Sequence, residues 1–458
     1  MIEYILRKLF QSFFVIFSVI TVVYLLQNNS VSDPVDDFIN SSFGEKTATK
    51  EAYMAAYIKE AKRQNKDQPS FYFSIVPSYF PDTLHKVIFH QDRVFIKDLL
   101  RYSKNTEGAL NFWSQIQSIE YFVESDSTLS TDSRTILNRI ARERDVSRLS
   151  TQIKQLELLK SENPAVENLI NRYYELSNSK KTFTFPKFIW HGSKNQYHSY
   201  ITAVFTGQLG KSKSDGKSAS TKILNSLKWS LSMNTIVFTI AALLGLWIGL
   251  WSIKNDGKRS EKSVATSLLF VYTMPVFWTA TIFLVFFTTK RYGGWMDIFP
   301  SPGLKFWYTD EPFHKQLYLS ASQLLLPIIC MTIPTLAYMS RIMKSKFAEV
   351  VSENFITTLK AKGLDKKRIF NRHVLKNGLI PYITILTGSI PGLFTGSLVI
   401  EKIFNIPGIG NLLLDSIYSS DWPVISGLVI MLAVVTVIAY LLADILYSKV
   451  NPRIVLGK

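Results

Sequence analysis

Hydrophobic and polar residues are distributed very unevenly along the chain, and six stretches contain no Asp, Glu, Lys or Arg. These stretches are 9–27, 229–253, 263–289, 316–340, 377–400 and 422–443. An α-helix rises about 1.5 Å per residue, so roughly 20 residues cross a hydrocarbon core about 30 Å thick. Each stretch is long enough for such a helix. The pattern therefore predicts six membrane-spanning helices.

The first stretch requires a choice between a retained helix and a secretory signal peptide. It is longer than the apolar region of a usual signal peptide, and the residues from Gln27 to Ser30 offer no small-x-small cleavage site. We therefore expect 1–27 to form an N-terminal transmembrane helix.

The segment 28–220 separates the first two apolar stretches and has a different pattern. Segments 46–62, 131–146 and 147–162 contain many helix-forming residues or repeat apolar residues at helical spacing. Pro164 suits the first turn of a further helix. The last part, 211–220, reads KSKSDGKSAS and is typical of a flexible linker. We expect a small, mostly helical domain at 28–220 and a five-helix core at 221–458.

Composition alone would hide this organisation. The 458 residues are 47% hydrophobic and 19% charged, and a mean hydropathy of +0.11 resembles that of an average soluble protein. The average combines the apolar stretches with a long polar segment. The single cysteine, Cys330, lies inside the fourth stretch without a disulfide partner, so we expect it to be a small core residue.

The charge distribution predicts an orientation in the membrane. The net charge is +17, yet 28–220 contains 26 Lys and Arg against 22 Asp and Glu, whereas 341–376 contains 10 against 3. The other basic clusters are 7–8, 254–262 and 449–458. Because basic residues favour the cytoplasmic side, we expect both termini and the loops 254–262 and 341–376 to be cytoplasmic. The segments expected to face outward are 28–228, 290–315 and 401–421.

Several other functions find no support in the residue pattern. The densest basic run, 360–372, has only Phe370 among its charges, whereas a nucleic-acid surface would interleave basic and aromatic residues. The strings at 210–212 and 216–218 end like a phosphate-binding loop but lack its glycine spacing. The His, Cys and carboxylate positions predict neither a metal site nor a catalytic set. We therefore predict no catalytic residue, no metal and no cofactor bound by this chain.

The segment 349–381 predicts a bent pair of short helices. A helix at 357–362 is followed by Gly363, and glycine readily adopts the left-handed conformation beyond a helix end. A second short helix, 366–376, leads back into the fifth apolar stretch. Such an elbow would form a rigid knob on a membrane bundle; the alternative is an ordinary basic loop.

Motifs in and around this segment resemble those of one transporter family. TTLKAKGL at 357–364, followed by HVLKNGLIP at 373–381, resembles the coupling loop of binding-protein-dependent ABC importer permeases of the dipeptide, oligopeptide and nickel type. The run 396–410 resembles the family pattern G-S-x-x-x-E-x-I-F-x-x-P-G-x-G. Three further runs resemble family patterns, namely 421–425 (D-x-P-V-x), 444–453 (the C-terminal run) and 207–212 (G-D-L-G-x-S, with Gln208 in the acidic position).

The resemblance implies an all-α polytopic membrane protein with six transmembrane helices of the type I ABC importer permease fold. A large, mostly helical extracytoplasmic insertion would lie between helices 1 and 2, where family members usually carry a shorter segment. The implied function is a permease subunit of the bacterial inner (cytoplasmic) membrane, forming half of the path for import of peptides or similar small solutes.

The resemblance also implies partners that complete the translocation path, hydrolyse ATP and deliver the substrate. We expect a second permease subunit, paralogous in a heterodimer, and two cytoplasmic ATPase subunits that bind ATP and Mg and carry out the hydrolysis. An extracytoplasmic substrate-binding protein and the lipid bilayer complete the set, and nucleic acid is not among the partners.

The resemblance also assigns roles to residues of this chain. The expected ATPase-coupling residues are Thr357, Thr358, Leu359, Lys360, Ala361, Lys362, Gly363, Leu364, Lys367, Arg368 and His373. Among them, Leu359, Ala361 and Leu364 would enter a groove of the ATPase, and the basic residues would meet its acidic rim. The expected external gate or docking surface for the binding protein consists of Glu401, Phe404, Pro407, Gly408 and Gly410. The substrate-binding residues are not predicted.

Three questions stay open at this point. The cargo can be a peptide, a nickel complex or a glycan fragment. The insertion can cap the outer mouth and dock a binding protein, or it can itself capture substrate. A membrane sensor or receptor with an extracytoplasmic ligand-binding domain is the alternative function, although it leaves the glycine-stopped elbow unexplained.

Overall fold

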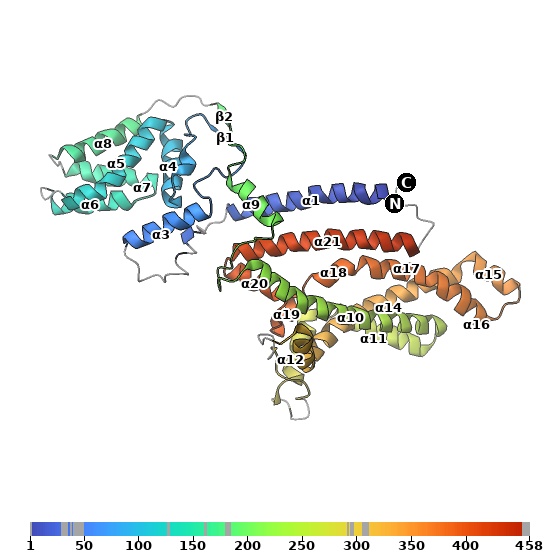
Figure 1. Ribbon diagram of the computed structural model, residues 1–458. Coiled ribbons are helices and arrows are strands. Elements are labelled where there is room, and N and C mark those ends of the chain that lie inside the picture. The colour runs from blue at the N-terminus through green and yellow to red at the C-terminus, as the bar shows by residue number, and fades with distance from the viewer. Residues whose placement is uncertain are drawn as a thin grey trace. The chain divides into compact units, whose positions relative to one another are not determined.

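The computed structural model describes residues 2–28, 35–36, 39, 50–125, 129–159, 163–178, 185–290, 293, 297–304 and 311–450. These residues are mainly helical and divide into two compact units. Unit 1 comprises Met1–Asn29 and Gly207–Lys458, and unit 2 comprises Ser30–Thr206. Figure 1 colours both units along the chain.

Unit 1 is built entirely from helices in its described part. Its long helices are α1 (Ile2–Asn28), α10 (Ala219–Lys254), α14 (Ala321–Ser352) and α21 (Trp422–Val450). Its shorter helices are α11 (Arg259–Thr273), α12 (Val276–Phe287), α13 (Phe313–Leu319), α15 (Asn354–Ala361), α16 (Lys366–Ile369), α17 (Leu375–Gly388), α18 (Ile390–Phe394), α19 (Leu398–Ile403) and α20 (Ile409–Tyr418). A π-turn at Phe370–Val374 joins α16 to α17.

The predicted spanning helices are recovered in part. Among the described residues, α1, α10, α14 and α21 are long and apolar enough to cross a membrane, and the pair α11 and α12 makes a fifth if its two halves form one span. That pair is bent by 95° at Met274 and Pro275. Proline disfavours a helical conformation in the residue before it, and Met274 is extended. The predicted helix 377–400 is divided among α17, α18 and α19, with extended backbone at Thr395.

Two glycines set the closest helix packing of unit 1, where α10 and α14 run parallel. A Cβ at Gly245 would lie 2.7 Å from Cβ of Met339, and one at Gly249 would lie 2.5 Å from Cβ of Met343. Small residues four apart allow two backbones to approach closely within a bundle. These glycines therefore serve packing inside this chain.

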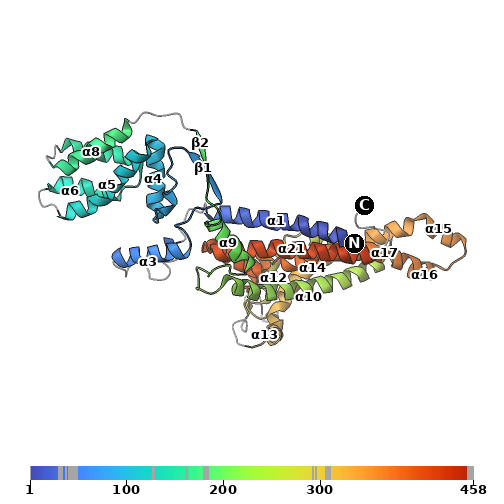
Figure 2. The same ribbon diagram turned by 45° about the horizontal axis from the view of Figure 1, so that its top comes forward.

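The helix ends that carry basic residues lie together at one end of the helical bundle of unit 1. Lys8 of α1 lies 3.5 Å from Asp444 near the end of α21, and Lys344 of α14 lies 2.8 Å from Glu261 at the start of α11. The ends of α1, α10, α11, α14 and α21 that carry basic residues therefore meet at one end, which we call the basic end. The elbow of α15 and α16 projects there (Figures 1 and 2). Residues 451–458, which include the last three residues of the motif predicted at 444–453, lie outside the described residues.

Unit 2 is a helical domain with one small sheet. Its elements are α3 (Lys50–Arg63), β1 (Phe73–Pro77), the 3-10 turn Leu84–Lys86, α4 (His90–Ser103), α5 (Thr106–Ser125), α6 (Thr131–Arg142), α7 (Val146–Leu158), α8 (Pro164–Ser177), β2 (Pro186–Trp190) and α9 (Gln196–Phe205). Helices α4 to α8 enclose a core that includes Phe95, Phe112 and Leu137. The helices predicted at 131–146, at 147–162 and from Pro164 are present as α6, α7 and α8, although α6 already ends at Arg142 and 160–162 lie outside the described residues. Helix α3 confirms the described part of the helix predicted at 46–62.

The prediction of a flexible linker at 211–220 is wrong. Lys211 and Ser218 form an antiparallel β-bridge, and α10 already begins at Ala219. Ser212 is only 3% exposed and donates a hydrogen bond to Asp421 at the start of α21. Composition alone predicted flexibility here, whereas a buried polar partner far along the chain fixes the segment.

Candidate functional site

The elbow has the hydrogen bonds that stop a helix and turn the chain. Gly363 has φ +76°, and its N–H donates to the Lys360 carbonyl at 3.0 Å. The Leu364 N–H reaches back to the Leu359 carbonyl at 3.3 Å. This pair of bonds is the Schellman arrangement, in which the residues at the positions of Leu359 and Leu364 make an apolar contact. The predicted helix, glycine stop and second helix are therefore present at 354–369.

The elbow is packed onto the bundle and is not a loose loop. Ile356 of α15, Ile369 of α16 and Val374 of the π-turn are all buried in one cluster with Met343 and Phe347 of α14. A lever built this way moves with the helices to which it is attached.

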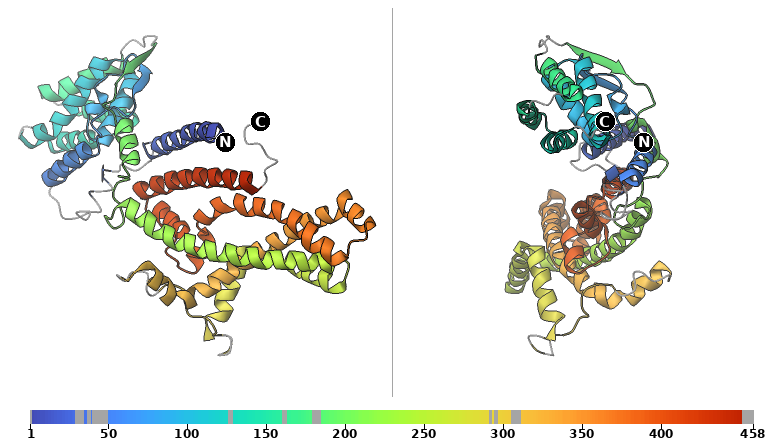
Figure 3. Two further views of the ribbon diagram at one scale, coloured as in Figure 1. Left: turned by 45° about the vertical axis from the view of Figure 1, so that its right-hand side comes forward. Right: turned by 90° about the vertical axis from the view of Figure 1, so that its left-hand side faces the viewer.

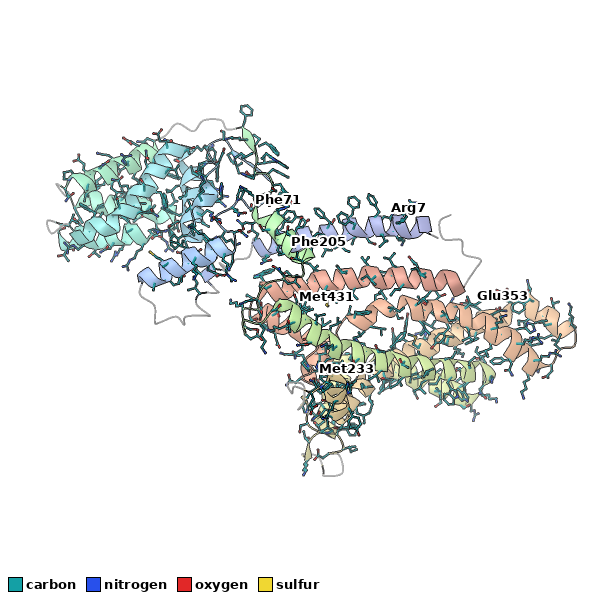
Figure 4. The ribbon with its side chains drawn as sticks, in the orientation of Figure 1. Arg7, Phe71, Phe205, Met233, Glu353 and Met431 are labelled. Carbon is teal, nitrogen blue, oxygen red and sulfur yellow. The ribbon has the colours of Figure 1, made fainter. Side chains whose placement is uncertain are left out.

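Two further contacts hold the segments on either side of the elbow, one between α14 and α17 and one between α10 and the π-turn that follows α16. The Phe347 ring lies directly against Gly378 of α17, where a Cβ would overlap it. The Lys254 ammonium lies 4.8 Å from the centroid of the Phe370 ring, a cation–π contact that ties the end of α10 to the elbow. Glu353 marks the base of the elbow in Figure 4.

The structure separates the predicted coupling residues into exposed and half-buried groups. Leu359, Leu364 and His373 are half-buried, and the two leucines pack against the cluster below the elbow. The exposed group contains Thr357, Thr358, Lys360, Ala361, Lys362, Gly363, Lys367 and Arg368. Within the part of the chain that the structure describes, none of these Lys and Arg side chains forms an ion pair. The elbow therefore presents a basic surface with unneutralised charge.

A second site lies away from the basic end, at the buried carboxylate of Glu401 in α19. Glu401 is fully buried, and one carboxylate oxygen accepts hydrogen bonds from Ser230 Oγ at 2.7 Å and from the Ser397 N–H at 3.2 Å. The other oxygen accepts from the N–H groups of Gly410 at 2.7 Å and Asn411 at 3.1 Å. Each oxygen thus has two donors, so the carboxylate acts as a structural centre. We call these five residues the Glu401 node.

Close approach explains why glycines surround the node. A Cβ at Gly410 would lie 2.5 Å from Cα of Leu398, and one at Gly396 would lie 2.5 Å from the Gly410 backbone nitrogen. A Cβ at Gly408 would overlap the Glu401 carboxylate itself. The spacing of glycines around Glu401 in the sequence therefore builds a cage for one carboxylate.

The predicted gate residues are mostly inside the protein. Glu401, Phe404, Gly408 and Gly410 are buried, and Pro407 is half-buried. Phe404 belongs to the core cluster that also contains Trp229, Met233 and Cys330, so Cys330 is a core residue as expected. Most of the residues predicted to form the gate therefore support the loop from inside and do not lie on its surface.

Sequence reasoning missed the partners of the node on α10. Ser230 accepts a hydrogen bond from the Ile409 N–H at 2.8 Å while donating to Glu401. Asn234, one turn later, donates to the carbonyls of Leu393 and Thr395, each at 2.9 Å, where α18 ends. Two polar residues four apart inside an apolar stretch share one helix face, and this spacing is the signal that could have identified them.

A second missed group links 207–222 to α21. Lys222 donates to Ser212 Oγ at 2.8 Å and lies 3.3 Å from Asp215. Burial raises the pKa of Asp215, but the Lys217 N–H and the Lys222 ammonium more than offset this, so the pKa lies below its ordinary value. Ser212 in turn donates to the buried Asp421. We call Ser212, Asp215, Lys222 and Asp421 the Ser212–Asp421 staple.

Long apolar helices, a bent helix pair and a rigid elbow define a polytopic membrane protein. The sequence profile of the binding-protein-dependent transport system inner membrane components matches residues 241–456, which include the elbow and Glu401. The chain belongs to this family of transport-system membrane components. The resemblance inferred from its motifs is therefore confirmed.

Three relatives with similar sequences are all named as permease proteins of peptide transport systems. The chain is 30% identical over 270 residues to the di/tripeptide transport system permease protein DppB of Pseudomonas aeruginosa, covering 57% of this chain and 80% of the relative. It is 31% identical over 276 residues to the dipeptide transport system permease protein DppB of Lactococcus lactis, covering 60% and 84%. It is 30% identical over 260 residues to the oligopeptide transport system permease protein OppB of Haemophilus influenzae, covering 57% and 79%. The sensor or receptor alternative finds no support in these comparisons.

Proposed function

We propose that this chain is one half of the translocation path of an ABC importer and is moved by ATP hydrolysis in partner subunits. The observation that carries the proposal is the elbow, which is stiff, basic, packed onto three helices and matched by the family profile. A subunit without its own nucleotide chemistry needs such a lever to receive force from another protein.

The topology that we propose has six crossings with both termini in the cytoplasm. The basic end contains the elbow, the loop 254–262 and the start of α1, as the positive-inside rule requires of a cytoplasmic end. Between the two ends the chain passes through α1, α10, the bent α11 and α12, α14, the divided α17 and α18, and α21. On this topology, 28–228 is extracytoplasmic and lies between the first two crossings of a bacterial inner membrane.

The elbow would dock on one of two cytoplasmic ATPase subunits, which bind ATP and Mg. Its exposed residues Thr357, Thr358 and Ala361 would make the close contact, and Lys360, Lys362, Lys367 and Arg368 would face an acidic rim. Leu359 and Leu364, which are half-buried and pack against the cluster below the elbow, would also hold the elbow's shape from inside.

The Glu401 node would act at the outer end by holding the gate loop in place. Because Glu401, Gly408 and Gly410 are buried, we propose that they position the loop surface that meets a substrate-binding protein or closes the path. A second, paralogous permease would complete the path opposite this chain. The bilayer surrounds both.

The cargo class that we propose is peptides or similar small solutes, because the named relatives are permeases for dipeptides, tripeptides and oligopeptides. For the insertion, we propose a cap over the outer mouth that docks the binding protein, with direct capture of substrate as the second candidate. Pull-down of peptides by the purified chain without any binding protein would favour the second.

Gly363→Glu tests the coupling role. The variant should insert into the membrane and assemble, yet lose both peptide uptake and the associated ATP hydrolysis in proteoliposomes, because the side chain strains the left-handed turn and adds an acid to a basic surface. Gly216→Glu is the matched control, since Gly216 also has positive φ, at 68°, but lies in the 211–218 turn. Normal uptake in Gly363→Glu would count against docking through the elbow.

A further inference from the structure

The two-stranded ribbon of unit 2 has one wholly apolar face. In the antiparallel register, Phe73 pairs with Trp190, Ile75 with Phe188 and Pro77 with Pro186. Directly opposed residues, and residues two apart on a strand, share one face of a sheet. All six residues therefore lie on the same face, which we call the aromatic face. The opposite face carries Ser74, Val76, Lys187 and Ile189, so it mixes polar and apolar residues. On that face Ser74 bonds to His191 at 3.0 Å and Lys187 bonds to Asp82 at 3.0 Å.

The aromatic face is exposed and takes no part in the core of unit 2. Ile75, Phe188 and Trp190 are 65%, 61% and 66% exposed, and Phe73 is 39% exposed. None of them belongs to the core enclosed by α4 to α8. The ribbon lies at the edge of unit 2, beside its helical bundle (Figures 1 and 3). A contiguous exposed patch of this kind on a folded domain marks an interaction surface.

The ribbon is fixed to the helix that leads out of unit 2. The N–H of Gln196 donates to the Pro69 carbonyl at 2.9 Å, and the N–H of His191 donates to the Tyr72 carbonyl at 2.7 Å. Tyr197 of α9 is buried, with its ring 4.6 Å from that of Phe71, which is labelled in Figure 4. The orientation of the aromatic face is therefore set by α9.

Chain continuity keeps this surface near the membrane. Unit 2 begins directly after α1 and ends at Thr206, followed by α10 at Ala219, and both helices qualify as membrane spans. From Trp190 the chain crosses a short connection and the 10 residues of α9 before unit 1 begins at Gly207. At about 3.5 Å per extended residue and 1.5 Å per helical residue, Trp190 lies at most about 40 Å from Gly207.

We propose that the aromatic face of the ribbon inserts into the surface of the lipid bilayer and anchors unit 2 against it. Tryptophan, tyrosine and phenylalanine suit the boundary between headgroups and acyl chains. Tyr72 stacks on Trp190 at 6.4 Å and keeps its hydroxyl on His198, so its apolar ring and polar tip point to different surroundings. The inference does not depend on the cargo, on the ATPase partners or on the side of the membrane that unit 2 occupies.

A bilayer fits this face better than a soluble binding protein does. A domain tethered at both ends to spanning helices always has lipid within reach, whereas a soluble partner covers the face only while it is bound. Large apolar side chains exposed between cycles would be an unfavourable state in water. The absence of any charged residue among the six also offers nothing to steer a protein partner.

The test places an environment-sensitive fluorophore on each face of the ribbon in the full chain. Cys330 is the single cysteine, so Cys330→Ser gives a background in which Phe188→Cys and Ile75→Cys report the aromatic face. Lys187→Cys is the matched control on the opposite face, next to Phe188. All three positions are exposed, so the labels should not disturb the fold. The proteins are reconstituted in vesicles of phosphatidylethanolamine and phosphatidylglycerol with lipids brominated in the upper acyl chain.

Bromolipids should quench the labels at positions 75 and 188 several-fold more strongly than the label at 187. Weak and equal quenching at all three positions would overturn the proposal. A change at positions 75 and 188 that occurs only when a substrate-binding protein is added would also overturn it, and would assign the face to protein docking.

Discussion

Glu401→Gln is the substitution that most sharply tests the Glu401 node. The amide has nearly the same shape as the carboxylate, so it creates no cavity. It replaces one acceptor oxygen by an NH₂ group, which then faces two of the four donors now bonded to Glu401. Either orientation of the amide leaves such a conflict, because each oxygen has two donors in the structure.

The expected loss follows from those two bonds. Hydrogen bonds to a charged group contribute about 1.5–3 kcal/mol each, so two of them give roughly 3–6 kcal/mol. A neutral amide is cheaper to bury than a carboxylate, which offsets part of this loss. We therefore expect a decrease of about 3 kcal/mol in the free energy of unfolding, equal to at least about 6 °C in melting temperature for a domain of up to roughly 250 residues.

Cys330 provides the assay for this prediction. It is 1% exposed and lies in the same core cluster as Phe404. Phe404 belongs to the loop that contains Glu401. A thiol-reactive fluorogenic dye added during a thermal ramp of the purified chain in detergent therefore reports when this core opens.

Asp415→Asn is the matched control, because it makes the same chemical change in the same region on an exposed carboxylate. Asp415 pairs with Lys402 at 2.7 Å, and both side chains are about half exposed. Such a pair contributes about 0–1 kcal/mol. Equal melting temperatures for Glu401→Gln and Asp415→Asn would refute the reasoning about the node.

Three further predictions concern contacts in unit 1. Gly378→Ala should destabilise the chain by about 1–3 kcal/mol through overlap with Phe347, and Phe347→Leu should restore part of the loss in thermal melts of the double variant. Asp421→Ala and Ser212→Ala should each raise hydrogen exchange and proteolysis at 207–218 to a similar extent, and unchanged protection would contradict the staple. The pKa of Asp215 is lower in the folded chain than its ordinary value of about 4, so its contribution to the free energy of unfolding is complete above about pH 4 and is lost as the pH falls through the folded value. Hydrogen exchange at 211–218 should therefore rise only below about pH 4. This rise should be absent in Asp215→Asn.

Local patterns predicted the elements well where local physics decides them. The helices that begin at Thr131 and Pro164 follow from apolar spacing and from proline at the first turn, and the structure adds Ser130 and Asn163 as their N-caps. The stop at Gly363 follows from the freedom of glycine at positive φ. These features need no knowledge of the rest of the chain.

Contacts between distant residues were beyond the sequence. Glu401 is recognisable as part of a motif, but its donors Ser230 and Asn411 become visible only when α10 and α20 are placed together. The same holds for Ser212 and Asp421, which are 209 residues apart and turn a polar linker into a fixed segment.

The ribbon of unit 2 is the feature that was least predictable from the sequence. β1 and β2 are separated by more than a hundred residues, and neither strand alone alternates cleanly between apolar and polar positions. Only the pairing brings Phe73, Ile75, Phe188 and Trp190 onto one face. For the elbow, the apolar character of Leu359 and Leu364 was evident, but whether they faced inward or outward depended on the cluster beneath them.

The central claim is that the elbow receives force from a separate ATPase. Its most direct test is cross-linking from Ala361→Cys in the Cys330→Ser background, because Ala361 is exposed on the elbow and the background has no other thiol. A bifunctional thiol-to-amine reagent should join the chain to a copurifying ATPase subunit in inverted membrane vesicles and stop the ATP-driven transport of peptide out of the vesicle lumen. Labelling of that cysteine only from the extracytoplasmic side, or transport out of the lumen that continues with the cross-link complete, would contradict the account.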